Sequence, residues 1–386
     1  MPAPDLATSP VTAPLFTPWT VGPCPLSHRV VMAPLTRMRA QTPANAPQPL
    51  NAEHYGQRAT AGGLIIAEAS QVLPTGQGAP ATPGIHSDAQ VAGWRGITDA
   101  VHAKDGRIFL QLWHVGRISH SSHQPGGALP IAPSAVAPTT GKVMSAKFTR
   151  EAFETPRALE LSEIPGIIDG YAQAARNAMQ AGFDGVEIHG ANGYLLEQFL
   201  QSRTNLRTDA YGGPIANRAR LMLEVTEAVV GVWGADRVGI RLSPFGVAND
   251  SGEAEPMPLY SYLIDELDRM GLAYLHLIEP RASGAGQAEV DHQNVPSAIE
   301  LFRPRWRSRL IGAGNFKPDT AADAIRKGHA DAIAFGRLFI SNPDLPERLR
   351  RNLPLTPYNR ATFYGGGREG YVDYPTYDGE PAAAAG

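Results

Sequence analysis

The chain has 386 residues, 43% of them hydrophobic and 18% charged, and its 34 Lys and Arg against 37 Asp and Glu give a net charge of −3. This composition excludes an extended disordered chain, and the charge balance argues against a nucleic-acid or membrane partner. The single cysteine, Cys24, excludes an internal disulfide and a metal site built on cysteines, and it fits a reducing, cytoplasmic compartment.

No basic region followed by an apolar run stands at the start of the sequence, and no uncharged apolar stretch reaches membrane-spanning length. We therefore expect neither a signal peptide nor a transmembrane helix. The two ends, residues 1–13 and 379–386, are rich in Pro and Ala and are expected to be loose tails.

Short apolar runs alternate with amphipathic segments along the chain, which predicts βα units and a parallel sheet. The eight expected strands are 29–32, 64–67, 108–112, 185–189, 238–242, 274–278, 310–312 and 332–335. The expected helices include 164–180, 217–233, 258–270, 320–327 and 343–350, and Gly182 is expected to cap the first of these. Eight such units predict one (β/α)8 barrel domain over residues 1–386.

The segment 120–157 is rich in Pro, Gly and Ser and is too long for an ordinary connection between a strand and a helix. It follows the third expected strand. We predict an excursion there, in the form of a hairpin lid above the catalytic face.

Polar residues stand at the carboxyl ends of the expected strands, where barrel enzymes carry their chemistry. The fourth strand is followed by a turn with His189, Asn192 and Tyr194. Neutral N–H donors of the first two can hold a carbonyl oxygen, and the Tyr194 hydroxyl, with an ordinary pKa of about 10, can give a proton beside it. This set suits the reduction of an activated C=C bond. The alternative is an ordinary loop histidine with a tyrosine packed at the end of a strand.

Glycine-rich turns follow the last two strands, at 312–315 and at Gly336-Arg337. Each turn precedes a helix, so backbone N–H groups can surround a phosphate, with Arg337 closing the site. These turns predict a phosphorylated cofactor.

Several motifs in sequence order resemble the Old Yellow Enzyme family of FMN-dependent ene-reductases. They are VMAPLTR at 31–37, QLWHVGR at 111–117, HGANGYLLEQFL at 189–200, NLRTDAYGG at 205–213 and AFGR at 334–337. FYGGG at 363–367 and GYVDYP at 370–375 extend the match to roughly residues 15–377, in a form similar to the bacterial N-ethylmaleimide and nitrate-ester reductase branch.

The resemblance implies that Thr36 donates to the flavin O4, that Gln111 binds the pyrimidine ring, and that Arg241 lies near N1 and the C2 carbonyl. The other residues implied to contact FMN are Pro34, Leu35 and Ala69 at the ring, and Gly314, Asn315, Gly336 and Arg337 at the phosphate. Trp113 and Tyr364 are implied to border the substrate together with His189 and Asn192. An ion pair with Glu187 is the alternative for Arg241, because strand alternation puts Glu187 on the same side as His189.

The implied activity has two half-reactions at one site. NADPH or NADH reduces bound FMN, and an α,β-unsaturated aldehyde, ketone, imide or nitroalkene then accepts the hydride, with Tyr194 as the acid. No metal is expected, the partners are small molecules, and the protein is expected to be a monomer or a weak homo-oligomer. The alternatives are another FMN barrel oxidoreductase and a non-catalytic flavin-binding barrel.

The sequence departs from the family pattern at two positions. Asn192 stands where some relatives have a second histidine, and both side chains can donate to an oxygen. Ala79, four residues before Pro83, stands where many relatives place a pocket tyrosine, so we expect a roomier pocket. Thr36, in place of a cysteine, separates the chain from the thermophilic-like branch.

Overall fold

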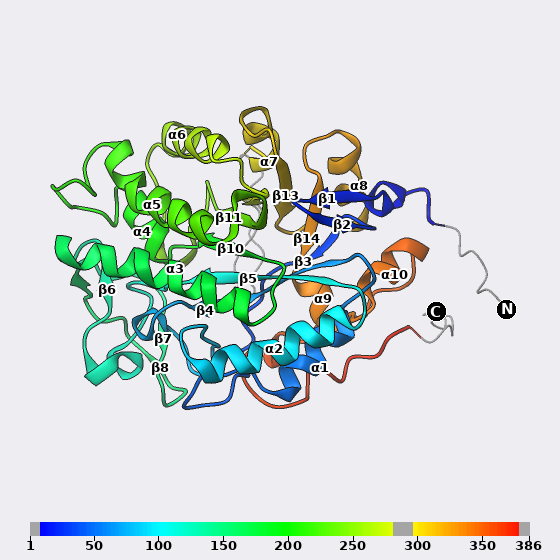
Figure 1. Ribbon diagram of the computed structural model, residues 1–386, viewed down its shortest axis with the longest axis horizontal. Coiled ribbons are helices and arrows are strands. Elements are labelled where there is room, and N and C mark those ends of the chain that lie inside the picture. The colour runs from blue at the N-terminus through cyan, green and yellow to red at the C-terminus, as the bar shows by residue number, and fades with distance from the viewer. Residues whose placement is uncertain (1–7, 281–295, 378–386) are drawn as a thin grey trace.

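The computed structural model describes residues 8–280 and 296–377, and its centre is a closed barrel of eight parallel strands (Figure 1). The strands follow one another around the barrel in chain order, and the last pairs with the first. They are β3 (Val30–Met32), β4 (Leu64–Gln71), β5 (Arg107–Trp113), β10 (Gly185–Gly190), β11 (Val238–Leu242), β12 (Tyr274–Ile278), β13 (Arg309–Ala313) and β14 (Ala332–Phe335). The predicted (β/α)8 barrel and its eight strands are confirmed.

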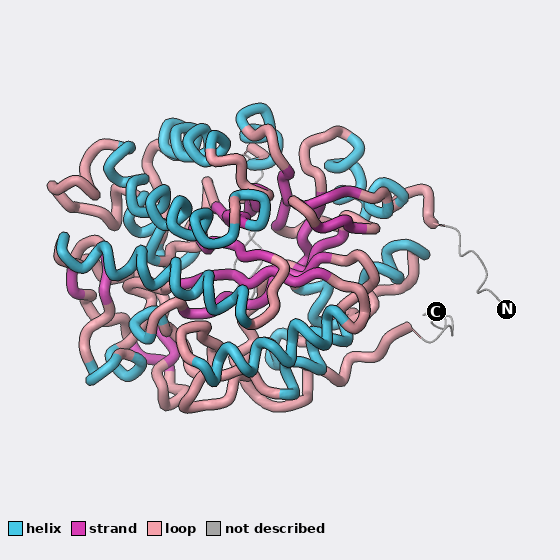
Figure 2. Tube along the Cα trace, in the orientation of Figure 1, coloured by secondary structure: helices cyan, strands magenta, loops and turns pink. Residues whose placement is uncertain are grey.

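Helices surround the strands on the outside, as the tube view shows (Figure 2). The longer ones are α1 (Pro49–Arg58), α2 (Asp88–His102), α3 (Ile164–Gln180), α5 (Ile215–Trp233), α6 (Pro256–Arg269) and α8 (Pro318–Arg326). Short helices are α4 (Leu195–Leu200), α7 (Ala298–Phe302), α9 (Arg337–Ser341) and α10 (Leu345–Arg351). The predicted helix 164–180 is α3 itself, and Gly182 follows it with a φ of +87°, the left-handed conformation of a helix cap. The helix predicted at 343–350 begins later, at Leu345.

The apolar core has two parts. The larger part lies between the strands and the surrounding helices, and a smaller one fills the barrel lumen. Side chains of the lumen come from alternate positions of the strands, among them Val31, Phe109 and Ile311.

An antiparallel hairpin, β1 (Trp19–Val21) and β2 (Cys24–Leu26), covers the lumen at the end where the barrel strands begin, called the lower end below. Trp19, Val21, Cys24 and Leu26 are buried against the lumen residues. The hairpin lies at the amino ends of the strands, because Arg309, the first residue of β13, donates to the Thr20 carbonyl oxygen at 3.0 Å.

The predicted excursion after the third barrel strand is also present. It carries β6 (Ile131–Ala132), β7 (Val143–Met144), β8 (Arg150–Glu151) and β9 (Arg157–Ala158). β7 and β8 form an antiparallel hairpin, called the lid hairpin below, while β6 and β9 pair in parallel.

Both ends of the described chain are tied to the barrel. From Ser9 onward the expected amino-terminal tail is bound, since the Ser9 N–H and the Thr12 hydroxyl donate to carbonyl oxygens of α10 at 2.8 and 2.7 Å. Residues 1–7, and the expected tail 379–386, lie outside the described residues. No helix in the described ranges is long and apolar enough to cross a membrane.

Candidate active site

Two adjoining cavities, of about 470 and 400 Å³, lie at the carboxyl ends of the strands. Both are lined by Pro34, Leu35, Asn192 and Arg241, so we treat them as one trough. The trough brings together every residue that the sequence predicted for the site. These are Pro34, Leu35, Thr36, Ala69, Gln111, Trp113, His189, Asn192, Tyr194, Arg241, Gly314, Asn315, Gly336, Arg337 and Tyr364.

The turn after β10 sets the direction of the side chains at 189–194. Asn192 and Gly193 have φ values of +60° and +75°, so two left-handed residues follow each other. Asn tolerates this conformation, and at Gly193 a Cβ would lie 2.6 Å from the Ala248 carbonyl oxygen, so only glycine fits there. The turn thereby returns Tyr194 toward His189.

Three rings meet at this end of the trough. Tyr194 lies edge-on to Trp113 and to His189, with ring centroids 4.9 and 5.1 Å apart. His189 is buried, and burial together with the positive charge of Arg241 holds its pKa well below the usual range, so the ring is neutral. Because its Nδ1 accepts from the Ala191 N–H at 3.3 Å, the proton is on Nε2 and this nitrogen is a donor.

Tyr194 is a phenol that stays protonated at neutral pH. Burial of the hydroxyl raises the pKa of Tyr194 to about 12, against the opposing effect of Asn249. The Asn249 amide also donates to the Asn192 carbonyl oxygen at 2.9 Å, which ties the loop after β11 to the turn after β10. The sequence analysis did not identify Asn249, since no motif marks this loop.

The floor of the trough is polar, and the contacts of Glu187 there differ from one alternative that the sequence left open. The direct Glu187–Arg241 ion pair, kept there as the alternative, is not formed. Glu187 instead accepts from the Gln111 amide at 2.7 Å and contacts His276 Nδ1 at 2.8 Å. Arg241 lines the trough, and its Nε is buried without a hydrogen-bond partner.

A second buried carboxylate fixes the loops that carry Thr36 and Ala69. Glu68 accepts from the Arg37 N–H at 3.3 Å and from the Tyr55 hydroxyl at 3.2 Å. Burial raises the pKa of Glu68 to about 7. Because Arg37 follows Thr36 and Glu68 precedes Ala69, this contact holds the carboxyl ends of β3 and β4 together.

The opposite end of the trough is cationic and narrow. Gly314 and Asn315 have φ values of +118° and +55°, and the Arg337 guanidinium donates to Asn315 at 3.4 Å. A Cβ on Gly336 would lie 3.2 Å from Leu35, so glycine allows a close approach there. Lys317 lines this end as well. The donors and positive charges suit a phosphate.

The lid hairpin contributes side chains that the sequence analysis did not name. Lys142, Val143, Met144 and Arg150 line the trough opposite Thr36 and Trp113, as does Phe153, which follows the hairpin. The excursion itself was predicted from its length and composition, but no periodicity in so short a hairpin marks which side chains face the pocket.

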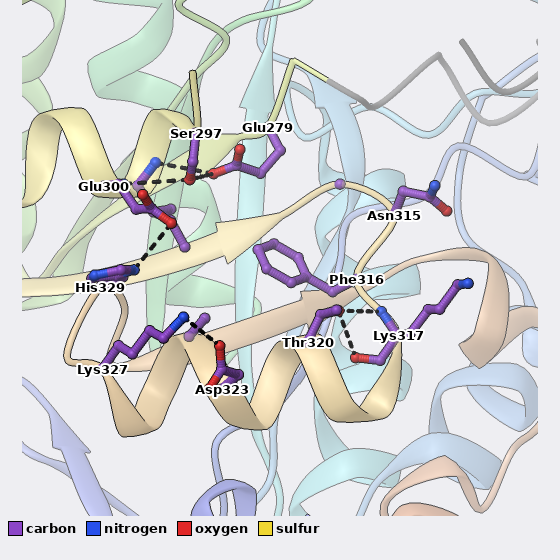
Figure 3. Close-up of a pocket in the computed structure, with 13 residues that line it drawn as sticks. Glu279, Ser297, Glu300, Asn315, Phe316, Lys317, Thr320, Asp323, Lys327 and His329 are labelled. Atoms are coloured by element: carbon purple, nitrogen blue, oxygen red, sulfur yellow. Dashed lines mark hydrogen bonds and ion pairs between the residues drawn. The ribbon is translucent and has the colours of Figure 1, made fainter. Parts of the chain in front are cut away.

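A further pocket of about 510 Å³ lies beside the phosphate end, on the outer side of β13 between α7 and α8 (Figure 3). Its charged residues include two pairs, Lys327 with Asp323 at 2.8 Å and His329 with Glu300 at 3.3 Å. Glu279 binds Ser297 and the first N–H groups of α7. These contacts give the side chains of this pocket structural roles.

Comparison with known proteins decides the family. The profile of the NADH:flavin oxidoreductase / NADH oxidase family matches residues 14–356. The chain belongs to this family. It is 46% identical to 12-oxophytodienoate reductase 1 of Oryza sativa subsp. japonica, over 97% of this chain and 96% of that protein. It is 45% identical to flavin oxidoreductase hxnT of Emericella nidulans, over 94% of this chain and 97% of that protein.

Solved structures agree with this assignment. Morphinone reductase superposes with a TM-score of 0.89 at 48% identity, over 96% of this chain and 98% of that one. A structure of morphinone reductase in complex with tetrahydroNAD gives a TM-score of 0.88 at 49% identity, over 95% of this chain and 98% of that one. The chain is therefore an FMN-dependent oxidoreductase of the Old Yellow Enzyme family, which uses NAD(P)H to reduce activated C=C bonds.

The trough of this Old Yellow Enzyme family member fits FMN. Its ring end offers the Thr36 hydroxyl, the Gln111 amide and the unpartnered Arg241 Nε, and its other end offers cations and glycine turns. Such a set matches a flat ring with polar edges joined to a phosphate.

Proposed function

We propose that the residues of the trough divide the reaction between them as follows. When bound along the trough, FMN would supply hydride transfer from NADPH or NADH to an α,β-unsaturated aldehyde, ketone, imide or nitroalkene. Pro34, Leu35, Thr36, Ala69 and Gln111 would border its ring. Gly314, Asn315, Gly336 and Arg337 would hold its phosphate, and the Arg241 cation would offset negative charge on the reduced ring.

His189 and Asn192 bind the oxygen that activates the double bond. The neutral Nε2–H of His189 and the amide of Asn192 donate to a carbonyl or nitro oxygen, and both bonds strengthen as charge moves onto it. This lowers the barrier to hydride addition at the β-carbon.

Tyr194 gives a proton to the α-carbon. Its raised pKa keeps the hydroxyl protonated until a carbanion-like centre forms, and the phenolate left behind is stabilised by the contact with Asn249. The observation that carries the proposal is this convergence of one acid and two neutral donors on one end of a trough that fits FMN.

Trp113, Tyr364 and the lid hairpin enclose the acceptor. Their apolar surfaces limit the access of water, which strengthens the hydrogen bonds to the activating oxygen. Because donor and acceptor use the same end of the trough, they bind in turn, and ping-pong kinetics are expected.

The proposal also covers the partners, the cellular location and the oligomeric state of the protein. The near-neutral charge gives no surface for nucleic acid, and the single cysteine, which is buried and free, fits a cytoplasmic enzyme that acts on small molecules. A monomer or weak homo-oligomer is proposed with it.

The test separates the two half-reactions. Tyr194→Phe should leave the reduction of FMN by NADPH unchanged and slow reoxidation by cyclohexenone by about 10²–10⁴-fold, the usual contribution of a general acid. Rapid mixing of each half-reaction measures this. Tyr262→Phe, on the outer helix α6, is the matched control and should behave as the parent. Equal slowing of both half-reactions would make Tyr194 a packing residue and contradict the proposal.

A further inference from the structure

Glu197 is a buried carboxylate directly beneath the turn that carries Asn192 and Tyr194. It lies in α4 and has no exposed surface. Its Oε2 accepts from the Gly193 N–H at 2.5 Å, and its Oε1 accepts from the Ser243 hydroxyl at 2.7 Å and from the Tyr260 hydroxyl at 2.6 Å. Three donors from different parts of the fold therefore meet on one carboxylate.

The turn is attached to this carboxylate at two consecutive residues. The Gly193 N–H donates to Glu197 directly. The Asn192 N–H donates to the Ser243 Oγ at 2.9 Å, and the Ser243 hydroxyl in turn donates a hydrogen bond to Glu197. These are the two residues with positive φ. Glu197 therefore supports both left-handed residues of the turn, Gly193 directly and Asn192 through Ser243.

We propose that Glu197 is a positioning residue, which holds the left-handed turn at 192–193 so that Asn192 and Tyr194 face the acceptor. The inference rests on the proposed function of those two residues. Glu197 itself does not line the trough. It acts through the backbone of the turn and through Ser243.

The identity of the side chain matters because above about pH 7, where Glu197 is ionised, both of its oxygens only accept hydrogen bonds. Three donors need acceptors at this site, and Glu197 supplies them with its two oxygens. In Glu197→Gln one oxygen becomes an NH2 group. Facing Gly193, this group meets another donor; facing Ser243 and Tyr260, it makes both hydroxyls turn and accept, which removes the hydrogen bond that Ser243 donates to the carboxylate. The volume is nearly unchanged, and either arrangement alters the support of the turn.

The experiment uses the FMN-loaded protein and two readouts that involve the turn. One is the affinity for para-hydroxybenzaldehyde, followed by its charge-transfer band with oxidised flavin, and the other is the rate of reoxidation by cyclohexenone. Because Glu197→Gln removes one hydrogen bond to a charged group, we expect the affinity and the reoxidation rate each to fall by about tenfold or more. The rate of FMN reduction by NADPH should stay that of the parent.

Two further variants keep the test decisive. Ser243→Ala removes the link to Asn192 without touching Glu197, so it should weaken both readouts even if Glu197→Gln does not accumulate as folded protein. Tyr262→Phe, on the same helix as Tyr260 but without a hydrogen bond to Glu197, is the control and should behave as the parent. If Tyr262→Phe reproduces the losses, or if Ser243→Ala and Glu197→Gln leave both readouts unchanged, the inference is wrong.

The design separates this inference from the proposed function. A parent protein that holds FMN but does not reduce cyclohexenone would contradict the proposed function. A parent that reduces it, with variants that slow both half-reactions equally, would contradict only the role of Glu197, because a positioning residue of the turn affects the second half-reaction.

Discussion

Glu187 shows how one side chain at the floor of the trough can act on two others. It accepts a hydrogen bond from the amide nitrogen of Gln111, a residue that lines the trough, and so fixes this side chain. Its carboxylate also interacts electrostatically with Arg241, because Glu187 pairs with Gly239, two residues before Arg241, in the register of β10 and β11. The charge therefore offsets that of the guanidinium without a direct contact.

We expect Glu187→Gln to raise the reduction potential of bound FMN. Without the carboxylate, the positive charge of Arg241 is free to stabilise the negative charge of reduced flavin. A tenfold change in the redox equilibrium is a shift of about 30 mV for a two-electron couple. Equilibration with a reference dye measures it. Glu253→Gln, which removes the partner of Arg218 outside the trough, is the control. A lowered potential in Glu187→Gln would contradict the expectation.

At the scale of elements, the carboxyl-terminal segment 362–371 brings Tyr364 to the trough. It has little regular structure and is held by arginines from the loop after β3. Arg39 donates to the carbonyl oxygens of Gly367, Thr362 and Glu369 at 3.0, 3.0 and 3.1 Å, and its guanidinium lies over the Tyr371 ring.

Arg39→Ala should therefore loosen this segment. Removing a partly buried donor leaves several carbonyl oxygens unsatisfied, at a cost of about 1–3 kcal/mol each when they are buried. We expect faster limited proteolysis within 362–371 and a higher KM for cyclohexenone. Arg368→Ala breaks an exposed ion pair between the same segment and Glu53, and should have little effect on either. Equal effects of the two variants on proteolysis and on KM would contradict the role of Arg39 in holding the segment 362–371.

The elements of this fold differ in how far the sequence predicted them. Strands such as β11 and β12 were predicted at the bounds that the structure has, because strands buried on both faces are short segments rich in apolar residues, here interrupted only by Arg241 and His276. The helix α1 was not predicted, since its sequence PLNAEHYGQR carries few aliphatic residues and it buries polar side chains such as Asn51 and His54. Its contacts are made with the distant segment around Tyr371.

The site was predictable where a motif fixes it and unpredictable where only packing does. Strand alternation placed Glu187 on the correct side but could not choose among Gln111, His276 and Arg241 as partners, which depends on the register between strands. Asn249 reaches the turn from a loop with no sequence signal. The roles assigned to Thr36, Gln111 and the other trough residues stay predictions.

At the scale of the whole molecule, buried histidines dominate the response to acid. Burial lowers the pKa of seven histidines below the ordinary value, namely His28, His54, His86, His114, His123, His189 and His276. Two buried carboxyls, Glu68 and Glu197, have pKa values raised to about 7. The two groups have opposite effects on stability.

We expect the free energy of unfolding to fall as the pH falls from 7 to 5. Each histidine gains a proton on unfolding below about pH 6.5, so its contribution is present above that pH and lost below it. The two carboxyls contribute stability at low pH and lose it as the pH rises through about 7. The histidines outnumber the carboxyls, so the net effect of acidification is a loss of stability.

Urea unfolding of the FMN-loaded protein at the two pH values measures this change. His28→Gln, far from the trough at the lower end of the barrel, should make the dependence on pH less steep. Stability that rises on acidification would show that the carboxyls prevail over the histidines.

The hairpin β1–β2 closes the lower end of the barrel with Trp19, Val21, Cys24 and Leu26. The trough lies at the other end of the barrel, where the strands end, and we expect donor and acceptor to bind there in turn. An excess of the hydride donor or of the acceptor therefore competes with the other for this site. The ratio of the two substrates then sets the flux, which is greatest at an intermediate ratio and declines when either one is in large excess.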